Sequence, residues 1–167
     1  MTPPRMTPPR RKRGGYFGPD PAAPQPLTVQ LKHRVRFSEV DAMAVTWHGR
    51  YAQFFEQANE ELGRSYGLGY ADFHRERLQA PIVQLHVDYF APTVLGEEVG
   101  IVGKLIWSEG ARINMEYEIF KQSGVLAATG FTVQMFVDAS GEVLLASPPL
   151  LERCRKRWSA GEFGEVR

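Results

Sequence analysis

The chain has 167 residues and a mass of 18.8 kDa; 43% of its residues are hydrophobic, 23% are charged, and its net charge is +1. This size fits one domain with a core large enough to fold without disulfide bonds or a structural metal, and the composition excludes a collagen-like or wholly disordered chain. No apolar run approaches the roughly 20 residues that a membrane-spanning helix requires. The one cysteine, Cys154, can form neither an intramolecular disulfide nor a multi-cysteine zinc site. We expect a cytoplasmic protein with no membrane partner.

Residues 1–26 have a composition of their own. They hold eight of the twelve prolines, and five basic residues against one acidic residue give them a charge of +4, which leaves −3 for the rest. Such a segment cannot bury enough apolar surface to offset its ordering entropy, so we predict a disordered, basic, proline-rich tail. No apolar stretch follows its charges, as a secretory signal would require. The basic run at 10–13 could contact nucleic acid or anionic lipid, but a solvated tail is favoured, and no nucleic-acid partner is expected.

Apolar and polar residues alternate with period two from residue 27 onward, which is typical of strands with one buried face. The alternation predicts strands over 27–37, 83–89, 99–107, 113–119 and 131–137. Short turns rich in Gly, Ser and Asp separate the last three, so these strands pair antiparallel in a meander. His33 interrupts the apolar row of the first strand, and we expect it at the edge of the core, bonded to a backbone carbonyl.

One long helix interrupts the strands. Apolar residues recur at helical spacing over 47–62, with Thr46 as the expected N-cap and Gly63 near the C-terminal end. A shorter helix is predicted over 71–77. A last helix starts around 147–148, with Ser147 as its cap and Pro148 at its first position. The sequence thus predicts an α+β domain over 27–147, an antiparallel sheet wrapped around one long helix, followed by a C-terminal helix and tail over 148–167.

The segment between the first strand and the long helix carries the candidate chemistry. Asp41 lies in this loop, and His48 lies in the first turn of the helix, where unpaired backbone N–H groups and the positive end of the helix dipole can hold a developing oxyanion. An acid, a histidine and an oxyanion site within eight residues are the parts of acyl-transfer chemistry. An Asp near a helix start is more often a cap or a partner of the helix dipole, so on spacing alone that interpretation is favoured over catalysis.

The pattern Asp-x-x-(small)-Val-x-aromatic-His-x-x-Tyr, which starts at Asp41, resembles the 4-hydroxybenzoyl-CoA thioesterase branch of the hotdog superfamily. This branch includes the acyl-CoA thioesterases of the YbgC type. The resemblance runs from about residue 30 to about 147 and includes the segment 81–97, which is similar to the central strand of the family, its proline and its Gly-acidic turn. It implies the hotdog fold, a curved antiparallel sheet wrapped around one long central helix.

The resemblance also implies roles for individual residues. Asp41 matches the catalytic carboxylate, which acts as nucleophile or general base, and the backbone N–H of His48 matches the group that polarises the thioester carbonyl. Tyr51 and Trp47 match aromatic residues that line the acyl site. The position of Ala44 is usually glycine in this family, so the loop would need a different backbone path if φ is positive there.

Binding of the CoA phosphates departs from the family pattern. Some members use a basic cluster after the strand that corresponds to 99–107, where this chain has only Arg112. Basic residues of the last helix are alternatives, although a solvated helix face is favoured for them: Arg153, Arg155, Lys156 and Arg157. Glu56 falls where a different thioesterase branch has its catalytic acid, but the favoured interpretation is that Glu56 makes a hydrogen bond between the helix and the sheet. The four histidines lack metal-ligand spacing, and no metal or cofactor is expected.

The function implied by the resemblance is hydrolysis of an acyl-CoA or aroyl-CoA thioester to a free acid and CoA. An acyl-carrier-protein thioester is an alternative substrate. A non-catalytic acyl-CoA-binding hotdog protein and a hotdog dehydratase are the rival functions. Sites of this family lie between two protomers, so the resemblance implies a homodimer or a homotetramer.

Overall fold

The protein is described by a computed structural model, which covers residues 15–18 and 20–164. In this part of the chain the elements follow one another as β1 (Leu27–Arg34), η1 (Phe37–Glu39), η2 (His48–Arg50), α1 (Tyr51–Tyr66), α2 (Tyr70–Arg75), β2 (Ile82–Tyr89), β3 (Glu98–Ile106), β4 (Arg112–Lys121), β5 (Leu126–Met135) and α3 (Pro149–Ser159). No helix among these residues is long and apolar enough to cross a membrane.

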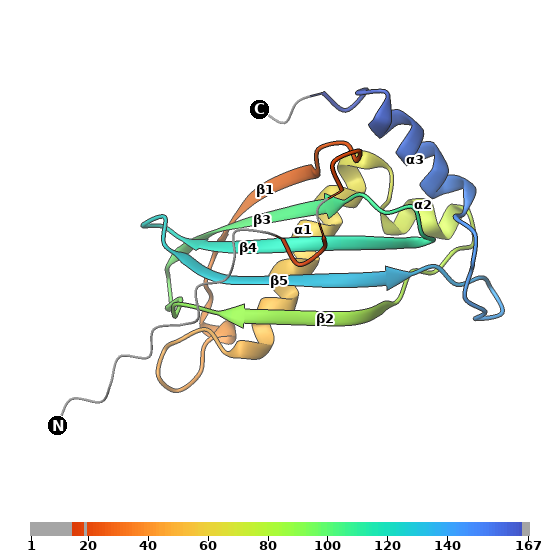
Figure 1. Ribbon diagram of the computed structural model, residues 1–167. Coiled ribbons are helices and arrows are strands. Elements are labelled where there is room, and N and C mark those ends of the chain that lie inside the picture. Colours follow the sequence, from red (N-terminus) through yellow and green to blue (C-terminus); the bar gives the residue numbers. More distant parts are fainter. Residues whose placement is uncertain (1–14, 19, 165–167) are drawn as a thin grey trace.

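The five strands form one antiparallel sheet in the order β1-β3-β4-β5-β2. Strands β3, β4 and β5 are the predicted meander, and β2 lies at one edge because it pairs with β5 alone. Helix α1 crosses one face of the sheet (Figure 1). The predicted α+β class, with a sheet against one long helix, is confirmed.

Helix α1 packs closely on the sheet. Its side chains Phe54, Phe55 and Ala58 are at most 1% exposed. Glycines on the sheet make room for them: a Cβ added at Gly103 would lie 2.8 Å from that of Ala58, and one at Gly130 would lie 2.5 Å from the ring of Phe55. The close approach fixes the position of α1, and with it the loop that leads into the helix.

Two predictions from the strand pattern were wrong. The strand expected over 131–137, with Phe131 in its core-facing row, is β5 over Leu126–Met135 with the other row facing α1, and the first strand is shorter than expected. Cross-strand partners share a face of the sheet, and the buried Met115 pairs with Thr132. The core row of β5 therefore contains Thr132, and Phe131 lies on the opposite face. The first strand also ends at Arg34 rather than at residue 37, and Phe37 is 83% exposed in a 3-10 turn.

Residues 16 and 17 cover part of the outer face of the sheet. The hydroxyl of Tyr16 donates to Asp88 (2.7 Å), and its ring lies 4.9 Å from that of Phe131. The N–H of Phe17 donates to Glu116 (3.1 Å). These contacts explain why an apolar row can face away from α1. The predicted disorder over 1–26 stays a prediction for residues 1–14 and 19, which lie outside the described residues.

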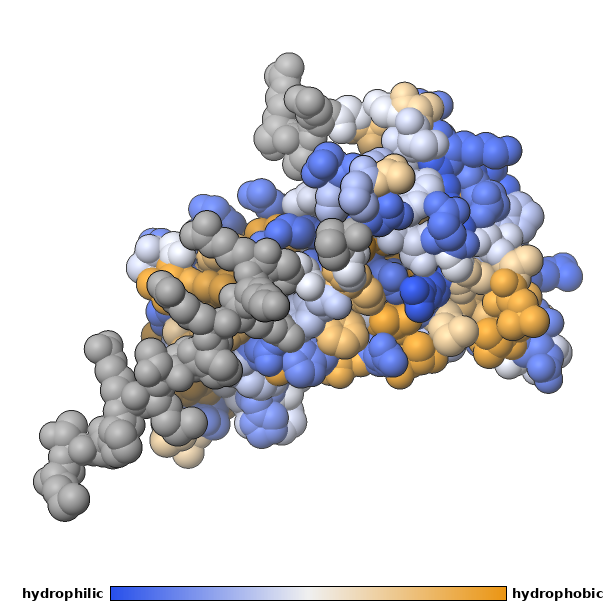
Figure 2. Space-filling model, in the orientation of Figure 1, coloured by the Kyte–Doolittle hydropathy of each residue, from blue (hydrophilic) through white to orange (hydrophobic). Residues whose placement is uncertain are grey.

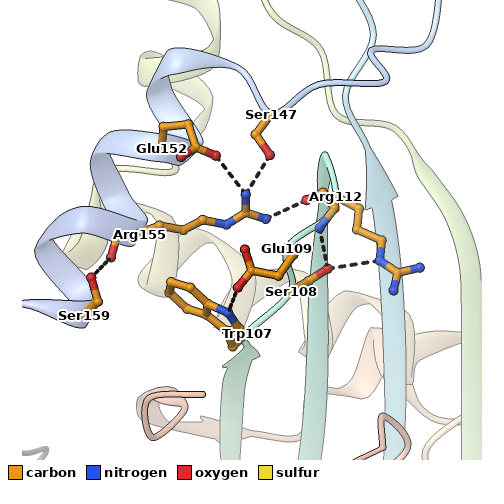
Figure 3. A network of polar contacts seen from close by, with 9 residues as sticks. Trp107, Ser108, Glu109, Arg112, Ser147, Glu152, Arg155 and Ser159 are labelled. Atoms are coloured by element: carbon orange, nitrogen blue, oxygen red, sulfur yellow. Dashed lines mark hydrogen bonds and ion pairs between the residues drawn. The ribbon is translucent and has the colours of Figure 1, made fainter. Parts of the chain in front are cut away.

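Helix α3 is held to the turn between β3 and β4 by a buried arginine. Arg155 is 7% exposed, and its guanidinium donates to Ser147 (2.6 Å), to Glu152 (3.0 Å) and to the carbonyl of Gly110 (Figure 3). Ser147 thus binds Arg155 instead of capping the helix, whose N-cap is Pro148. Since both terminal nitrogens of its buried guanidinium are bound within the chain, Arg155 is a structural residue and not a free phosphate ligand.

Candidate active site

The loop that carries Asp41 is closed by its own backbone. The N–H of Asp41 donates to Val45 O (2.9 Å), and that of Ala44 donates to Asp41 O (3.0 Å). On the far side of the loop, Leu95 N donates to Ala44 O (3.1 Å), and Val45 forms a bridge with Val94. The loop is thus held between η1 and the segment before β3, which limits the positions that the Asp41 carboxylate can take.

The Asp41 carboxylate is partly exposed and is oriented by this loop. Its Oδ1 accepts hydrogen bonds from Met43 N (2.8 Å) and Val45 N (3.3 Å). Among the hydrogen bonds of the described residues, none reaches its Oδ2. The side chain therefore closes its own loop, does not cap the helix, and keeps one oxygen available for chemistry.

Ala44 has φ +58°, one of two non-glycine residues with positive φ in the described chain. Left-handed backbone at a residue that carries a Cβ costs about 1–2 kcal/mol. We expect Ala44→Gly to raise the free energy of unfolding by up to about 1 kcal/mol, because the strain exceeds the added chain entropy of glycine. Chemical denaturation measures this; Ala44→Val, with a larger Cβ substituent, should destabilise, and equal stability of all three proteins would contradict the strain.

The start of the long helix has unpaired N–H groups. Thr46 was predicted to cap it, but its buried hydroxyl accepts from Thr93 (2.7 Å), and the N-cap of η2 is Trp47, without a side-chain cap. Among the described residues, no hydrogen bond is donated by the N–H of His48 or Gly49. The Trp47 ring lies over Gly49, where an added Cβ would be 2.2 Å from the ring. This uncapped terminus can stabilise negative charge.

His48 and Tyr51 occupy different environments. His48 is exposed, its ring lies 4.9 Å from that of Trp47, and its carbonyl accepts a hydrogen bond from Tyr89 OH (3.0 Å). Tyr51 is 3% exposed; its hydroxyl shares a hydrogen bond with Thr93 (3.2 Å), and its ring meets that of Tyr89 edge-on at 5.0 Å. In this single chain Tyr51, the first residue of α1, is therefore buried against Thr93 and Tyr89 and fixes the position of the helix start.

A buried hydrogen-bonded pair of side chains anchors the other end of the loop. His33 Nε2 lies 2.8 Å from Glu39 Oε2, and Arg36 N donates to the same oxygen (2.7 Å). Burial raises the pKa of Glu39, but the hydrogen bonds from His33 and Arg36 outweigh it and hold the pKa below its ordinary value. The Glu39 carbonyl accepts from Trp47 N (2.9 Å). His33 therefore binds a carboxylate and not the backbone carbonyl that was expected. The sequence analysis did not predict Glu39 as its partner, although the two residues are only six positions apart in the chain.

A cavity of about 180 Å³ lies between α1 and the edge strand β2. Gln53 in the first turn of α1 and Glu56 in the second line it from the helix, and Leu85 lines it from β2. The Glu56 carboxylate accepts from Tyr70 OH (3.4 Å). Neither Asp41 nor His48 lines this cavity or the three larger ones found among the described residues. Since β2 is an edge strand and its lining residues Ile82 and Leu85 are about half exposed, the cavity is open on the side of β2.

Arg112 lies at the other end of the sheet. Arg112 is the first residue of β4. The last residue of β4, Lys121, pairs with Val99 of β3, which lies beside the end of β1 that leads to Asp41. The Nε of Arg112 donates to Ser108 (3.2 Å; Figure 3). About nine residues of strand, or roughly 30 Å, separate this end from the Asp41 loop. The predicted site residues Asp41, Trp47 and His48 are thus brought together, whereas Arg112 of the same chain is not.

An antiparallel sheet against one long helix, with a carboxylate loop entering the helix, defines the hotdog class of protein. Residues 35–154 match the model of the Thioesterase-like superfamily. The chain therefore belongs to this superfamily, and the predicted resemblance is confirmed.

The relatives of the chain agree with this assignment. It is 28% identical over 127 residues to a putative esterase of Synechocystis, covering 74% of this chain and 75% of that protein. It is 24% identical to the Escherichia coli acyl-CoA thioester hydrolase YbgC, covering 63% and 78%. The structure of the DHNA-CoA thioesterase of Staphylococcus aureus superposes with a TM-score of 0.72 at 26% identity, covering 84% and 97%. The predicted class of enzyme, a thioester hydrolase, is confirmed at the level of the family.

Proposed function

We propose that the protein hydrolyses acyl-CoA or aroyl-CoA thioesters to a free acid and CoA. The observation that carries the proposal is the helix start: the Asp41 carboxylate, with Oδ2 available, shares one loop–helix junction with the unpaired N–H groups of His48 and Gly49. Relatives named as acyl-CoA thioester hydrolase and DHNA-CoA thioesterase support it.

The chemistry follows from where charge develops. The thioester carbonyl points at the N–H groups of His48 and Gly49, which stabilise the oxyanion of the tetrahedral intermediate. Asp41 either attacks the carbonyl carbon, forming an anhydride that water then hydrolyses, or removes a proton from the attacking water. In both routes the C–S bond breaks and CoA leaves as a thiolate. Sulfur donates little resonance into the carbonyl, so this carboxylate and oxyanion site suffice without a serine triad.

The test is release of free thiol from a panel of benzoyl, short-chain and long-chain acyl-CoA thioesters, followed with a chromogenic thiol reagent. We expect turnover well above the rate without protein for at least one of them. Calorimetric binding of the same thioesters without turnover would contradict hydrolysis and favour the rival acyl-CoA-binding protein. Hydration of crotonyl-CoA without thiol release would identify a dehydratase instead.

A second copy of the chain would complete the cleft. Edge strand β2 is eight residues long and exposes apolar side chains, among them Ile82 (52%), Val83 (51%) and Leu85 (47%). Apolar surface follows the lower edge of the molecule where β2 lies (Figure 2). A long apolar edge is a template for pairing with another strand. We propose a homodimer through β2, which covers this edge and closes the cavity beside it.

The proposed dimer also gives Arg112 a role. Antiparallel pairing of two β2 strands brings the Asp41 end of one protomer to the Arg112 end of the other, as the strand directions require. The proposed contact of Arg112 with CoA phosphates therefore needs the partner chain. The cleft remains open to a carrier-protein arm in place of CoA.

Replacement of Val83 by lysine should break the dimer, because it places a charge within the apolar edge. Light scattering should give twice the chain mass of 18.8 kDa for the wild type and the chain mass for Val83→Lys, together with loss of thioesterase activity. Val125→Lys, at a similarly exposed valine (51%) in the turn before β5, is the control and should stay dimeric and active. A wild-type monomer with full activity would refute the dimer.

A further inference from the structure

Two cavities meet at one aromatic side chain. The cavity of about 180 Å³ beside β2, called the inner cavity below, shares Asn59 and Tyr70 with a second cavity of about 500 Å³ between α1 and α2, called the outer cavity. Leu68 and Phe73 contribute apolar surface to the outer cavity. Tyr70 therefore stands between a small space that begins near the helix start and a larger space farther along α1.

The backbone of Tyr70 is held firmly, whereas its ring is not. Gly69, which precedes it, packs on Gly63 of α1 so closely that a Cβ at Gly63 would lie 2.7 Å from the Cα of Gly69. The side chain is 56% exposed, and its hydroxyl makes one long hydrogen bond to Glu56 (3.4 Å). Partial burial, with the negative charges of Glu56 and Glu60, raises the pKa of this hydroxyl, so its protonated, donating form is favoured further. A fixed backbone with a lightly held ring is suited to closing one end of a cavity.

The size of the inner cavity limits what it can hold. A cavity of about 150 Å³ accommodates one benzene ring. The inner cavity, at about 180 Å³, thus has room for one aromatic ring or an aliphatic group of similar volume once the proposed dimer covers its β2 side. A longer chain must pass Tyr70 and Asn59 to reach the outer cavity.

We infer that the ring of Tyr70 sets the upper size of the acyl group, so that the protein prefers aroyl and short acyl thioesters over long-chain ones. This inference rests on the proposed thioesterase function and deepens it. Removal of the ring joins the two cavities and admits a long chain, whose apolar tail then contacts the surface around Leu68 and Phe73.

The experiment compares kcat/KM for benzoyl-, hexanoyl- and palmitoyl-CoA among the wild type, Tyr70→Ala and Tyr70→Phe. We expect Tyr70→Ala to raise the palmitoyl-to-benzoyl ratio about tenfold or more, within the range that pocket shape gives to specificity. Tyr70→Phe keeps the ring and should keep the wild-type ratio. Arg64→Ala changes the wall of the outer cavity alone and is the matched control, with an unchanged ratio.

The outcomes separate this inference from the function on which it rests. An unchanged ratio in an active Tyr70→Ala protein, or an equal shift in Tyr70→Phe, would overturn the role of the ring and leave hydrolysis standing. Absence of hydrolysis of every thioester by the wild type would overturn the function and the inference with it. Tyr70→Leu, which shortens the side chain without emptying the site, should give an intermediate ratio and replaces Tyr70→Ala if that variant does not fold.

Discussion

Asp41→Asn is expected to lower kcat for thioester hydrolysis by about 10²–10⁴-fold, the range associated with a general acid or base. The amide oxygen of asparagine can still accept the hydrogen bonds from Met43 N and Val45 N, so the loop keeps its shape while the negative charge is lost. Binding should change little, because the carboxylate acts on the carbonyl in the transition state. Steady-state thiol release gives kcat and KM separately, and the melting temperature reports the fold.

The chain contains a matched control for this substitution. Asp138 closes a turn in the same way, with its Oδ1 accepting from Ser140 N (2.8 Å) and Glu142 N (3.0 Å), but it follows β5 at the end of the sheet opposite to Asp41. Asp138→Asn should leave kcat unchanged. If Asp41→Asn retained full activity, the carboxylate would have no part in the reaction, and Glu56 on α1 would become the next acid to test.

Loss of the Glu39 carboxylate is expected to be the largest effect on stability. Glu39→Ala removes the acceptor of both His33 and Arg36 N in a buried place, and hydrogen bonds to a charged group contribute about 1.5–3 kcal/mol each. We expect a decrease of about 3 kcal/mol in the free energy of unfolding at pH 7. Since the Glu39 carbonyl is bound to Trp47 N, activity should fall along with stability.

The same interaction predicts a pH dependence. The folded-state pKa of Glu39 is lower than its unfolded value near 4.5, so its stabilisation is complete above that value and is lost as the pH falls through the folded pKa. The stability difference between wild type and Glu39→Ala should therefore be constant near neutral pH and shrink below about pH 4.5.

Denaturant titrations at several pH values measure this difference. Glu98→Ala is the comparison, because the pKa of Glu98 is also lowered, by its hydrogen bond to Lys32, whose side chain is 78% exposed, so that solvent screens the pair. Its effect on stability should be small at every pH. A Glu39→Ala effect that persisted undiminished at pH 3 would assign the loss to packing rather than to the charge.

Much of the fold follows from local pattern. The period-two rows of β3 and β4 predicted their buried faces, because each of these strands has one face on α1 and the other away from it. In β5 the same rule failed: Phe131 looked like a core residue, but it faces Tyr16 and Phe17 on the outer side, a contact more than 110 residues away in sequence. Alternation tells which residues share a face, and it does not tell which face is the core.

By itself, the sequence determined the order of the elements and the motif from Asp41 to Tyr51, because helix periodicity, turn residues and motif spacing are local properties of the chain. The tertiary structure alone decided that Oδ1 of Asp41 closes its loop, that Glu39 binds His33, and that Tyr70 lies between two cavities. It also placed Arg112 at the far end of the sheet. These contacts depend on which side chains meet once the sheet packs around α1. A local sequence pattern carries no information about distances between residues far apart in the chain.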